Sequence, residues 1–285
     1  MIALEACADT QLPVAFIART AVRALFKELV LYPKPGLVSR IDSGAHADMN
    51  AATLMHSLFT LRHYFRECAC AGASGAAFAT LQRFGLAAEQ RMMRATGDVN
   101  THRGAIFCLG LLAAAAGSLM RERRSISGRA LGQCVARRWG DAIAQTTPLN
   151  RLHEGAPTGC GPAIVGARRQ AMGGYPSVFS LALPVLLDTL ARGASDEAAL
   201  LQTLFTLMAT LDDTNLLRRG GKIGLAFVQL QARRFLAVGG VFTPEWRDRA
   251  IAIHHACIAR RLSPGGSADL LAGAWFVAAL QGHVI

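Results

Sequence analysis

The sequence predicts a single all-α domain, a bundle of about ten to eleven helices. Hydrophobic residues make up 52% of the chain, and Ala and Leu dominate where a strand-rich protein would carry Val, Ile, Thr and aromatic residues. Apolar residues recur at spacings of three and four in most segments, while period-two alternation is nearly absent. No repeat, low-complexity tract or long linker interrupts the sequence, so we expect residues 1–285 to form one domain.

Signals at the ends of segments divide the chain into helices. Pro33 and Pro35 fix their own φ angles and end the first helix, and Thr96-Gly97 is typical of a helix end. N-caps are expected at Ser195, Thr243 and Ser267. The helices are expected near residues 12–31, 49–70, 75–95, 102–120, 128–145, 160–172, 177–192, 196–213, 221–237, 244–261 and 267–281.

The formal net charge is +11, from 30 basic and 19 acidic residues. Such a charge is compatible with nucleic acid, a membrane surface or a polyphosphate as partner. The basic residues stand singly or in pairs between apolar residues, without interleaved aromatic residues, so their pattern does not favour a nucleic-acid partner. Only three of them are lysines, and a coding bias towards Arg is consistent with much of the excess.

Cysteine spacing and hydropathy predict a cytoplasmic protein without a membrane partner. The seven cysteines form no CxxC pair and no metal-spaced set, which is typical of small core residues in a reducing cytosol. The first ten residues carry acids and no basic region, so no signal peptide is expected. The longest apolar run, residues 105–120, is shorter than the roughly 20 residues that span a bilayer, and predicts a buried helix.

The segment from Tyr32 to Asn50 carries more charged groups than an ordinary connector. Its prolines hold Lys34 on a stiff stretch of chain, and Gly36 and Gly44 permit tight turns. The loop also offers two carboxylates and an imidazole, those of Asp42, Asp48 and His46. A solvated connector is the alternative interpretation.

A second polar segment, residues 96–110, leads into the long apolar helix. Asn100 or Thr101 can cap that helix, which leaves its free backbone N–H groups and positive dipole end beside His102 and Arg103. The segment therefore predicts an anion site. An ordinary surface position is the alternative for each side chain taken alone.

Asp212 and Asp213 follow an apolar helix that is predicted to end at residue 213. Adjacent acids at a helix C-terminus oppose the dipole and repel each other, at about 1 kcal/mol for each unfavourable placement. Mg²⁺ is the natural compensating ion, because it takes one or two carboxylates together with substrate phosphates. Pairing with Arg218 or Arg219 is the alternative.

Two further carboxylates, Glu28 and Glu89, lie on otherwise apolar stretches, where burial of an unpaired charge is costly. Each therefore needs a partner or a metal. No GxxxxGK[ST], GxSxG or HExxH pattern occurs, nor a GxGxxG after a strand. Phosphate binding would thus rely on helix N-termini and basic side chains.

Four segments resemble, in order and spacing, the signatures of the triphosphoribosyl-dephospho-CoA synthase family: PKPGLVSRIDSGAHADM, GDVNTHRGAIF, DDTNLLRRGG and LSPGGSADLLA. The resemblance implies an all-helical enzyme that transfers the triphosphoribosyl group of ATP to the 2′-hydroxyl of 3′-dephospho-CoA and releases adenine. The product would pass to a holo-carrier-protein synthase that serves an acyl-carrier subunit, of malonate decarboxylase in preference to citrate lyase. We also consider a homodimer.

The resemblance further implies roles for particular residues. Glycosidic cleavage develops oxocarbenium charge and needs a base and an acid, and the triphosphate needs Mg²⁺ and cations. We assign Mg²⁺ binding or oxocarbenium stabilisation to Asp48, Asp212 and Asp213, with Glu28 and Glu89 as candidates for the same set. Phosphate binding is assigned to Lys34, Arg103, Arg219 and the backbone of Gly220 and Gly221. His46 and His102 are the candidates for proton transfer or phosphate binding, and Asn100, Thr101, Asn215 and Arg168 for holding substrate.

The sequence departs from the family pattern at two places. The family usually has Gly-Val-Asn-Thr-His-Lys-Gly, whereas here Asp98 precedes Val99 and Arg103 replaces the lysine. Arg keeps the charge but presents a planar fork instead of a point ammonium. Gln170 stands where the family commonly has glutamate, so we assign no catalytic carboxylate at that position.

Two other functions compete with this one. A Mg²⁺-dependent helical hydrolase of nucleotides or ADP-ribosyl groups would release adenine, ribose phosphates or pyrophosphate without any acceptor. A basic helical nucleic-acid-binding protein would bind with a steep salt dependence. The second function leaves the acids on apolar stretches unexplained.

Overall fold

The computed structural model of the protein describes residues 11–146 and 166–284. Within these ranges the chain is helical and contains no strand, which confirms the predicted all-α class. The α-helices are α2 (Gln11–Val30), α3 (Ala51–Thr60), α4 (Arg62–Ala73), α5 (Phe78–Thr96), α6 (Arg103–Arg121), α7 (Gly128–Gln145), α8 (Ala167–Met172), α9 (Leu183–Ala191), α10 (Asp196–Thr210), α11 (Thr214–Ala237), α12 (Trp246–Ala259) and α13 (Gly265–Leu280). Two short elements complete the order, the π-helix η3 (Val178–Ala182) and the 3₁₀-helix η4 (Gly240–Phe242).

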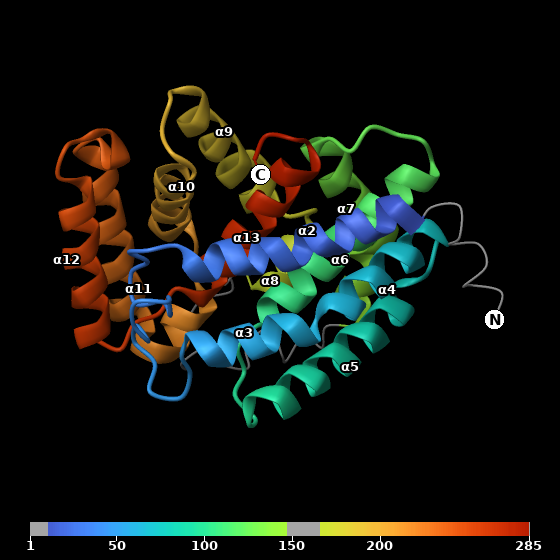
Figure 1. Ribbon diagram of the computed structural model, residues 1–285, viewed down its shortest axis with the longest axis horizontal. Coiled ribbons are helices and arrows are strands. Elements are labelled where there is room, and N and C mark those ends of the chain that lie inside the picture. The colour runs from blue at the N-terminus through green and yellow to red at the C-terminus, as the bar shows by residue number, and fades with distance from the viewer. Residues whose placement is uncertain (1–10, 147–165, 285) are drawn as a thin grey trace.

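Helix α6 forms the centre of the molecule, where it packs against α4, α2, α13 and α7 (Figure 1). Every residue from Cys108 to Leu119 is buried. A Cβ added at Gly72 of α4 would lie 1.8 Å from the carbonyl oxygen of Ala114, and one at Gly117 would lie 2.0 Å from that of Ala69. These small residues therefore let the backbones of α4 and α6 touch, at the close packing typical of protein interiors.

In the described part of the chain, α6 is the one helix long and apolar enough to cross a membrane. Its most apolar window is 78% buried inside the protein. Burial among other helices is typical of a core helix. The helix thus agrees with the buried helix predicted at residues 105–120.

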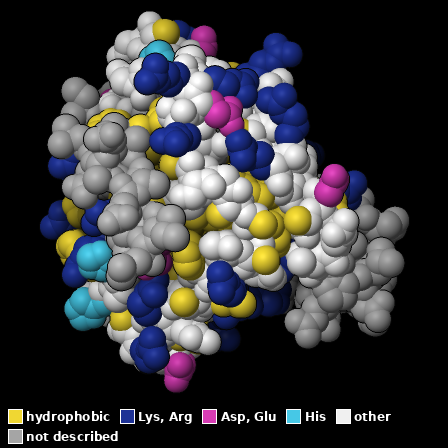
Figure 2. Space-filling model, turned by 90° about the vertical axis from the view of Figure 1, so that its right-hand side faces the viewer, with side chains coloured by type: hydrophobic (Ala, Val, Ile, Leu, Met, Phe, Trp, Pro, Cys, Tyr) yellow, Lys and Arg dark blue, Asp and Glu magenta, His cyan; other side chains and the backbone are white. Residues whose placement is uncertain are grey.

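The arrangement of the helices brings distant parts of the sequence together at one end of the molecule. Helices α11 and α12 form one end of the molecule, and α4, α5 and α7 lie towards the opposite end (Figure 1). The loop between α2 and α3 runs beside α11 and α12, so residues early in the chain lie next to residues near its end. Basic side chains on the face drawn in Figure 2 stand as separate groups, without forming a continuous track.

Several helix boundaries differ from the predicted ones. The segment expected as one helix over residues 49–70 is two helices that meet at Leu61. Of the helix expected at 160–172, residues 160–165 lie outside the described residues. The start of α12 follows Glu245 rather than Thr243, and α13 begins before Ser267. Ser195 caps α10 as predicted, with its hydroxyl oxygen accepting the N–H of Ala198 at 3.3 Å.

The largest correction concerns the paired acids. Helix α10 ends at Thr210, so the expectation of two acids at its C-terminus was wrong. Asp213 is instead the N-cap of α11, which begins at residue 214 and not at 221. A carboxylate is favourable at that end of a helix dipole, and no compensating ion is required there. Gly221, with φ 60° and ψ −161°, breaks α11 internally, which explains why the sequence pattern indicated a helix start at that point.

Candidate active site

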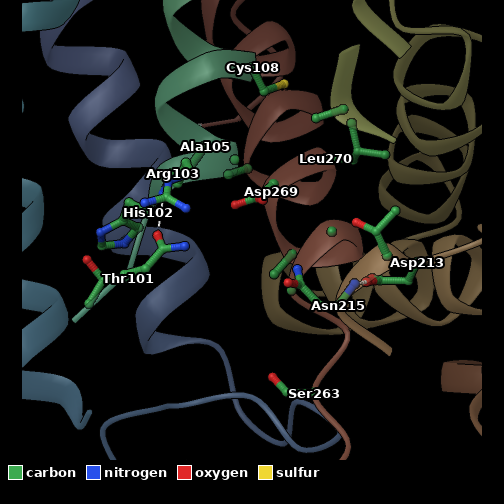
Figure 3. A pocket seen from close by; sticks show the side chains of 18 of the residues that line it. Thr101, His102, Arg103, Ala105, Cys108, Asp213, Asn215, Ser263, Asp269 and Leu270 are labelled. Atoms are coloured by element: carbon green, nitrogen blue, oxygen red, sulfur yellow. Dashed lines mark hydrogen bonds between the residues drawn. The ribbon is translucent and has the colours of Figure 1, made fainter. Parts of the chain in front are cut away.

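A cavity of about 780 Å³ opens where the N-terminal ends of α6, α11 and α13 meet the loop that follows α2 (Figure 3). Small-molecule sites typically enclose roughly 300–1,000 Å³. Helix N-termini attract anions through their free N–H groups and positive dipole ends. The position and size of the cavity therefore suit an anionic ligand such as a nucleotide.

The cavity brings together most of the side chains that the sequence singled out. Those that line it are Glu28, His46, Asp48, Glu89, Asn100, Thr101, His102, Arg103, Arg168, Asp212, Asp213, Asn215 and Arg219. Three predicted residues are not among the lining residues. Lys34 is fully buried, and Gly220 and Gly221 lie at the kink in α11.

Asp213 joins the first turns of two helices. One carboxylate oxygen accepts the backbone N–H groups of Asn215 and Leu216 at 2.9 and 3.4 Å. The other accepts the backbone N–H and the hydroxyl of Ser267 at 2.8 and 3.1 Å. The side chain is almost fully buried, and this burial raises the pKa of Asp213 although the four donors favour its ionised form. Its acceptor sites are filled by protein donors.

Asp212, its neighbour, is placed differently. It lines the cavity and is partly exposed to it. No described residue forms a hydrogen bond or ion pair with its carboxylate, and the predicted alternative of pairing with Arg218 or Arg219 is not seen. An unpaired carboxylate on a cavity wall is available to a ligand or a metal ion.

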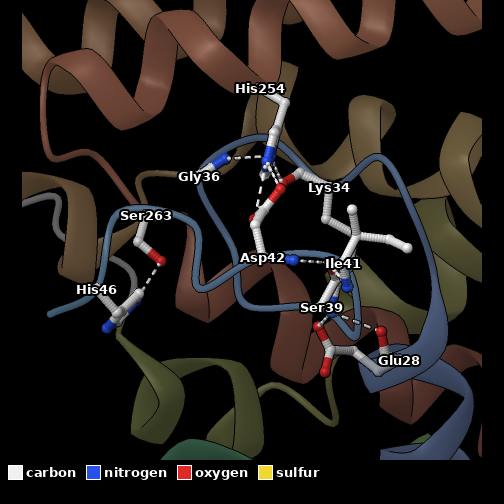
Figure 4. A network of polar contacts seen from close by, with 9 residues as sticks. All are labelled: Glu28, Lys34, Gly36, Ser39, Ile41, Asp42, His46, His254 and Ser263. Atoms are coloured by element: carbon white, nitrogen blue, oxygen red, sulfur yellow. Dashed lines mark hydrogen bonds and ion pairs between the residues drawn. The ribbon is translucent and has the colours of Figure 1, made fainter. Parts of the chain in front are cut away.

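Glu28 and Lys34 form a buried ion pair beside the cavity (Figure 4). The Nζ of Lys34 lies 2.6 Å from Glu28 Oε1 and donates to the Glu28 carbonyl oxygen at the same distance. Burial lowers the pKa of Lys34, while the charge of Glu28 opposes that shift. The ammonium therefore neutralises Glu28 and ties the loop to the end of α2, and it does not reach into the cavity.

The loop is also fixed by His254 of α12, a residue that the sequence did not single out. Its Nε2 lies 2.9 Å from Asp42 Oδ2, and its Nδ1 lies 2.5 Å from the carbonyl oxygen of Lys34 (Figure 4). The imidazole is fully buried. A histidine on a helix far along the chain gives no local signal of this contact, because the partners become neighbours only in the folded protein.

Around His46, the loop contributes a polar cluster to the cavity wall. His46 Nε2 lies 3.0 Å from Ser263 Oγ, and its Nδ1 lies 3.0 Å from Nη2 of Arg219. Arg219 also donates to the carbonyl oxygen of Ala45 at 3.1 Å. Burial and the charge of Arg219 lower the pKa of His46, against a weaker opposing effect of Asp48. The imidazole is thus held neutral beside a guanidinium.

At the start of α6, His102 is held by the hydroxyl of Ser57, which is itself bonded to the hydroxyl of Thr101. Thr101 donates to Ser57 Oγ at 2.7 Å, and Ser57 Oγ lies 2.6 Å from His102 Nδ1. Burial, with a smaller effect of Lys34, lowers the pKa of His102 to about 4, so the imidazole is neutral at neutral pH. A neutral ring suits hydrogen bonding better than electrostatic phosphate binding. Ser57, on α3, was missed because a lone serine in a helix carries no distinctive pattern.

The basic residues at this end of the cavity already have contacts within the protein. Arg103 Nε lies 3.1 Å from Glu89 Oε2. Glu89, which was expected to need a partner or a metal, is thus paired with the guanidinium of Arg103. Asn100 Oδ1 accepts the N–H of Arg103 at 3.3 Å. Of the two predicted caps, Asn100 therefore contacts the start of α6, whereas the Thr101 hydroxyl bonds to Ser57. Arg168 lies over the ring of Phe107, with 5.9 Å between its Cζ and the ring centroid.

Asp269 is the most important residue that the sequence reasoning missed. It lies on the second turn of α13, and its side chain points across the cavity towards the start of α6 (Figure 3). Burial raises the pKa of Asp269 well above its usual range, and the carboxylates of Asp213 and Glu28 raise it further. The side chain borders the cavity on one side and packs against protein atoms on its other sides. Its place early in a helix gave it the pattern of an ordinary first-turn acid.

Gln170 and the glycines of α13 complete the wall. The amide of Gln170 donates to Ser177 Oγ at 2.7 Å and accepts the N–H of the same residue at 3.1 Å, so it stabilises a turn. A Cβ added at Gly265 would lie 2.6 Å from Asn215 Nδ2, and one at Gly266 would lie 3.2 Å from the Asp213 carboxylate. These two glycines leave room for the polar side chains of the α11 start.

The described residues contain no group of three or more His, Cys, Asp or Glu side chains that could hold a metal ion by themselves. The predicted metal ligands Glu28, Asp48, Asp212 and Asp213 therefore do not form a closed protein site. Mg²⁺ commonly binds through one or two carboxylates, with phosphate oxygens and water supplying the other ligands. The donor set here suits that open mode of binding.

Comparison with known proteins identifies relatives over nearly the whole chain. Residues 14–152 and 162–284 match a protein family described as ATP:dephospho-CoA triphosphoribosyl transferase. The 2-(5″-triphosphoribosyl)-3′-dephosphocoenzyme-A synthase of Pectobacterium atrosepticum is 40% identical over 269 residues, which cover 92% of this chain and 88% of the relative. A probable synthase of the same name from Pectobacterium carotovorum is 40% identical with the same coverage. No solved structure matches the chain.

Proposed function

The chain belongs to the ATP:dephospho-CoA triphosphoribosyl transferase family, and we propose that the cavity described above is where it carries out the family reaction. The protein is accordingly a triphosphoribosyl-dephospho-CoA synthase, a transferase of a family that uses ATP and 3′-dephospho-CoA. In this reaction the 2′-hydroxyl of dephospho-CoA displaces adenine from C1 of the ATP ribose. The triphosphate remains intact.

The observation that supports this proposal is the presence of both carboxylates and arginines within one cavity. The carboxylates of Asp48 and Asp212 line the cavity, and Arg168, Arg218 and Arg219 line it as well. Carboxylates stabilise the positive charge that develops on a ribose when its glycosidic bond breaks. Arginines and helix N-termini stabilise the negative charge of a triphosphate. One cavity thus meets both electrostatic needs of the reaction.

We propose that the unpaired carboxylate of Asp212 is the base that acts on the 2′-hydroxyl of dephospho-CoA. A base must remove the proton of the attacking hydroxyl, and the base needs an oxygen that is free to accept it. Asp213 offers no free acceptor, because its oxygens are occupied by four donors. Arg219, held against His46, would then place a guanidinium next to the triphosphate.

We propose that Mg²⁺ is bound with the triphosphate by Asp48 and by one carboxylate oxygen of Asp212, which leaves the second oxygen of Asp212 for the proton of the attacking hydroxyl. Both line the cavity, and neither carboxylate is paired with a Lys or Arg. The bound ion would neutralise part of the triphosphate charge. Calorimetric titration of the protein with Mg²⁺ alone and with Mg-ATP checks this proposal: tight binding of Mg²⁺ without nucleotide would contradict the open site.

Release of adenine from ATP tests the proposed reaction. Purified protein with Mg²⁺, ATP and dephospho-CoA is expected to release one adenine for each triphosphoribosyl-dephospho-CoA formed, and none without the acceptor. Equal release without dephospho-CoA would support the nucleotide hydrolase instead. Salt-dependent binding of nucleic acid together with no adenine release would support the second alternative.

We also propose in which compartment the protein acts and where its product goes. We place the protein in the cytoplasm, in keeping with the free thiols of Cys68, Cys108, Cys134 and Cys257. The product is expected to pass to a holo-carrier-protein synthase and then to the acyl-carrier subunit of malonate decarboxylase. Reconstitution with the carrier subunits of malonate decarboxylase and of citrate lyase, each with its own synthase, decides between the two destinations.

A further inference from the structure

We propose that Asp269 is the acid that delivers a proton to the departing adenine. The inference rests on the proposed function, because it assigns one step of that reaction to a named residue. It is supported by the position of the carboxylate, by the groups that face it, and by the contacts that occupy the other carboxylates of the cavity.

The position of Asp269 is fixed between two helices. Its carboxylate fills the space that a side chain at Gly104 would take, since a Cβ added there would lie 1.9 Å from Asp269 Oδ2. The backbone N–H of Ala105, in the first turn of α6, is close enough to lower the pKa of Asp269 slightly against the larger effect of burial. The carboxylate is therefore held at the start of α6, on the cavity wall (Figure 3).

The groups around Asp269 favour its protonated form. Asp213 faces it from the start of α11 and Glu28 from α2, and both raise its pKa, in addition to the larger effect of burial. Cys108 on α6 and Tyr175 before η3 are close enough to interact with it, and both are neutral because their own pKa values are raised. The nearest cavity cation on α6, Arg103, is paired with Glu89. Asp269 thus faces two carboxylates, and Arg218 and Arg219 of α11, which also line the cavity, are not among the groups that shift its pKa.

The other carboxylates of the cavity are less suited to this role. Glu28 is paired with the ammonium of Lys34 at 2.6 Å, and Asp213 is bound by four donors. The side chain of Asp48 is 59% exposed and lies 3.4 Å from His46 Nδ1, so it is open to solvent rather than enclosed by the protein. A carboxylic acid kept neutral by burial and by neighbouring carboxylates is the usual proton donor in glycosidic cleavage.

In the proposed step, one bond breaks and one bond forms at C1 of the ATP ribose. The bond between C1 of the ribose and N9 of adenine breaks, and its electron pair stays on the purine. Asp269 gives its proton to a purine ring nitrogen, so that adenine leaves as a neutral molecule. The 2′-hydroxyl oxygen of dephospho-CoA forms the new bond to C1 and gives its proton to the base. Exchange with water returns a proton to Asp269 and removes one from the base.

The decisive experiment compares two leaving groups. In an ATP analogue methylated at N7, the purine carries a positive charge and leaves as a neutral base without a proton. We expect Asp269→Asn to lower kcat about 10²–10⁴-fold with ATP, the usual contribution of general acid catalysis, and less than about tenfold with the analogue. The matched control is Asp188→Asn, an exposed aspartate of α9 that pairs with Arg192, and it should behave as wild type with both substrates.

A measurement on the wild-type protein gives a second test that needs no variant. With ATP, kcat/KM should fall as the pH rises through the pKa of Asp269, whereas the methylated analogue should show no such fall. Equal slowing of both substrates by Asp269→Asn, or identical pH profiles for both in wild type, would overturn the inference. Adenine release without dephospho-CoA would instead overturn the proposed function, and the comparison of leaving groups would still test Asp269.

Discussion

Replacement of Asp213 by Ala should destabilise the fold, whereas replacement of Asp212 should not. The Asp213 carboxylate caps α11, and loss of such a cap typically costs about 1 kcal/mol. The change also leaves the buried N–H of Ser267 without an acceptor, at about 1–3 kcal/mol. The Ser267 hydroxyl can rotate to another partner and adds little. The expected loss is therefore about 2–4 kcal/mol in the free energy of unfolding.

Thermal unfolding followed by circular dichroism measures this difference directly. In a chain of this size, about 2–3 °C of Tm corresponds to each kcal/mol, so Asp213→Ala should lower Tm by about 4–12 °C. Asp212→Ala is the matched control, since its carboxylate has no partner in the described structure. It should keep the wild-type Tm and lose adenine release. Equal Tm values for the two variants, or a larger loss for Asp212→Ala, would refute the division of roles between these neighbours.

Three further changes test other parts of the site. Gly104→Ala should cost about 1–3 kcal/mol of stability, as overpacking does, and should lower adenine release, because the new Cβ would displace the Asp269 carboxylate; wild-type activity would contradict this contact. Lys34→Met should cost about 3–5 kcal/mol because it leaves Glu28 buried and unpaired, and the double change with Glu28→Gln should restore most of that loss in a denaturant titration. Ionisation of Asp269 is unfavourable in the folded protein, because its pKa is raised there. The resulting loss in the free energy of unfolding is absent below the ordinary aspartate pKa and is complete above the raised pKa of Asp269. Asp269→Asn should therefore gain in Tm relative to wild type as the pH rises through that window, and a constant difference across pH would contradict the raised pKa.

The fold class was predictable because it depends on local pattern. The helical spacing of apolar residues and the continuous apolar run at residues 105–120 are properties of short windows, and both correspond to helices in the structure. Helix ends were less predictable. The kink at Gly221 made α11 look as if it began at residue 221. The pair Asp212-Asp213 was also ambiguous, because an N-cap aspartate after another aspartate has the same local sequence as two acids at the end of the preceding helix.

The site was predictable where its residues sit in distinctive motifs, and not where a contact arises only on folding. His46, Asn100 and Asp212 stand in unusual stretches, and the structure places all three on one cavity. His254 contacts Asp42 across 212 positions of sequence, and no local feature of α12 indicates that partner. Asp269 was missed for a different reason, since an acid in an early helical turn normally needs no further explanation.

The dependence of adenine release on the acceptor tests the central claim most directly. The purified protein is mixed with Mg²⁺ and ATP, and free adenine is measured by chromatography before and after addition of dephospho-CoA. The claim predicts that adenine appears only after the addition, in an amount equal to the triphosphoribosyl-dephospho-CoA formed. Adenine that appears at the same rate without dephospho-CoA, or that fails to appear with it, would contradict the claim.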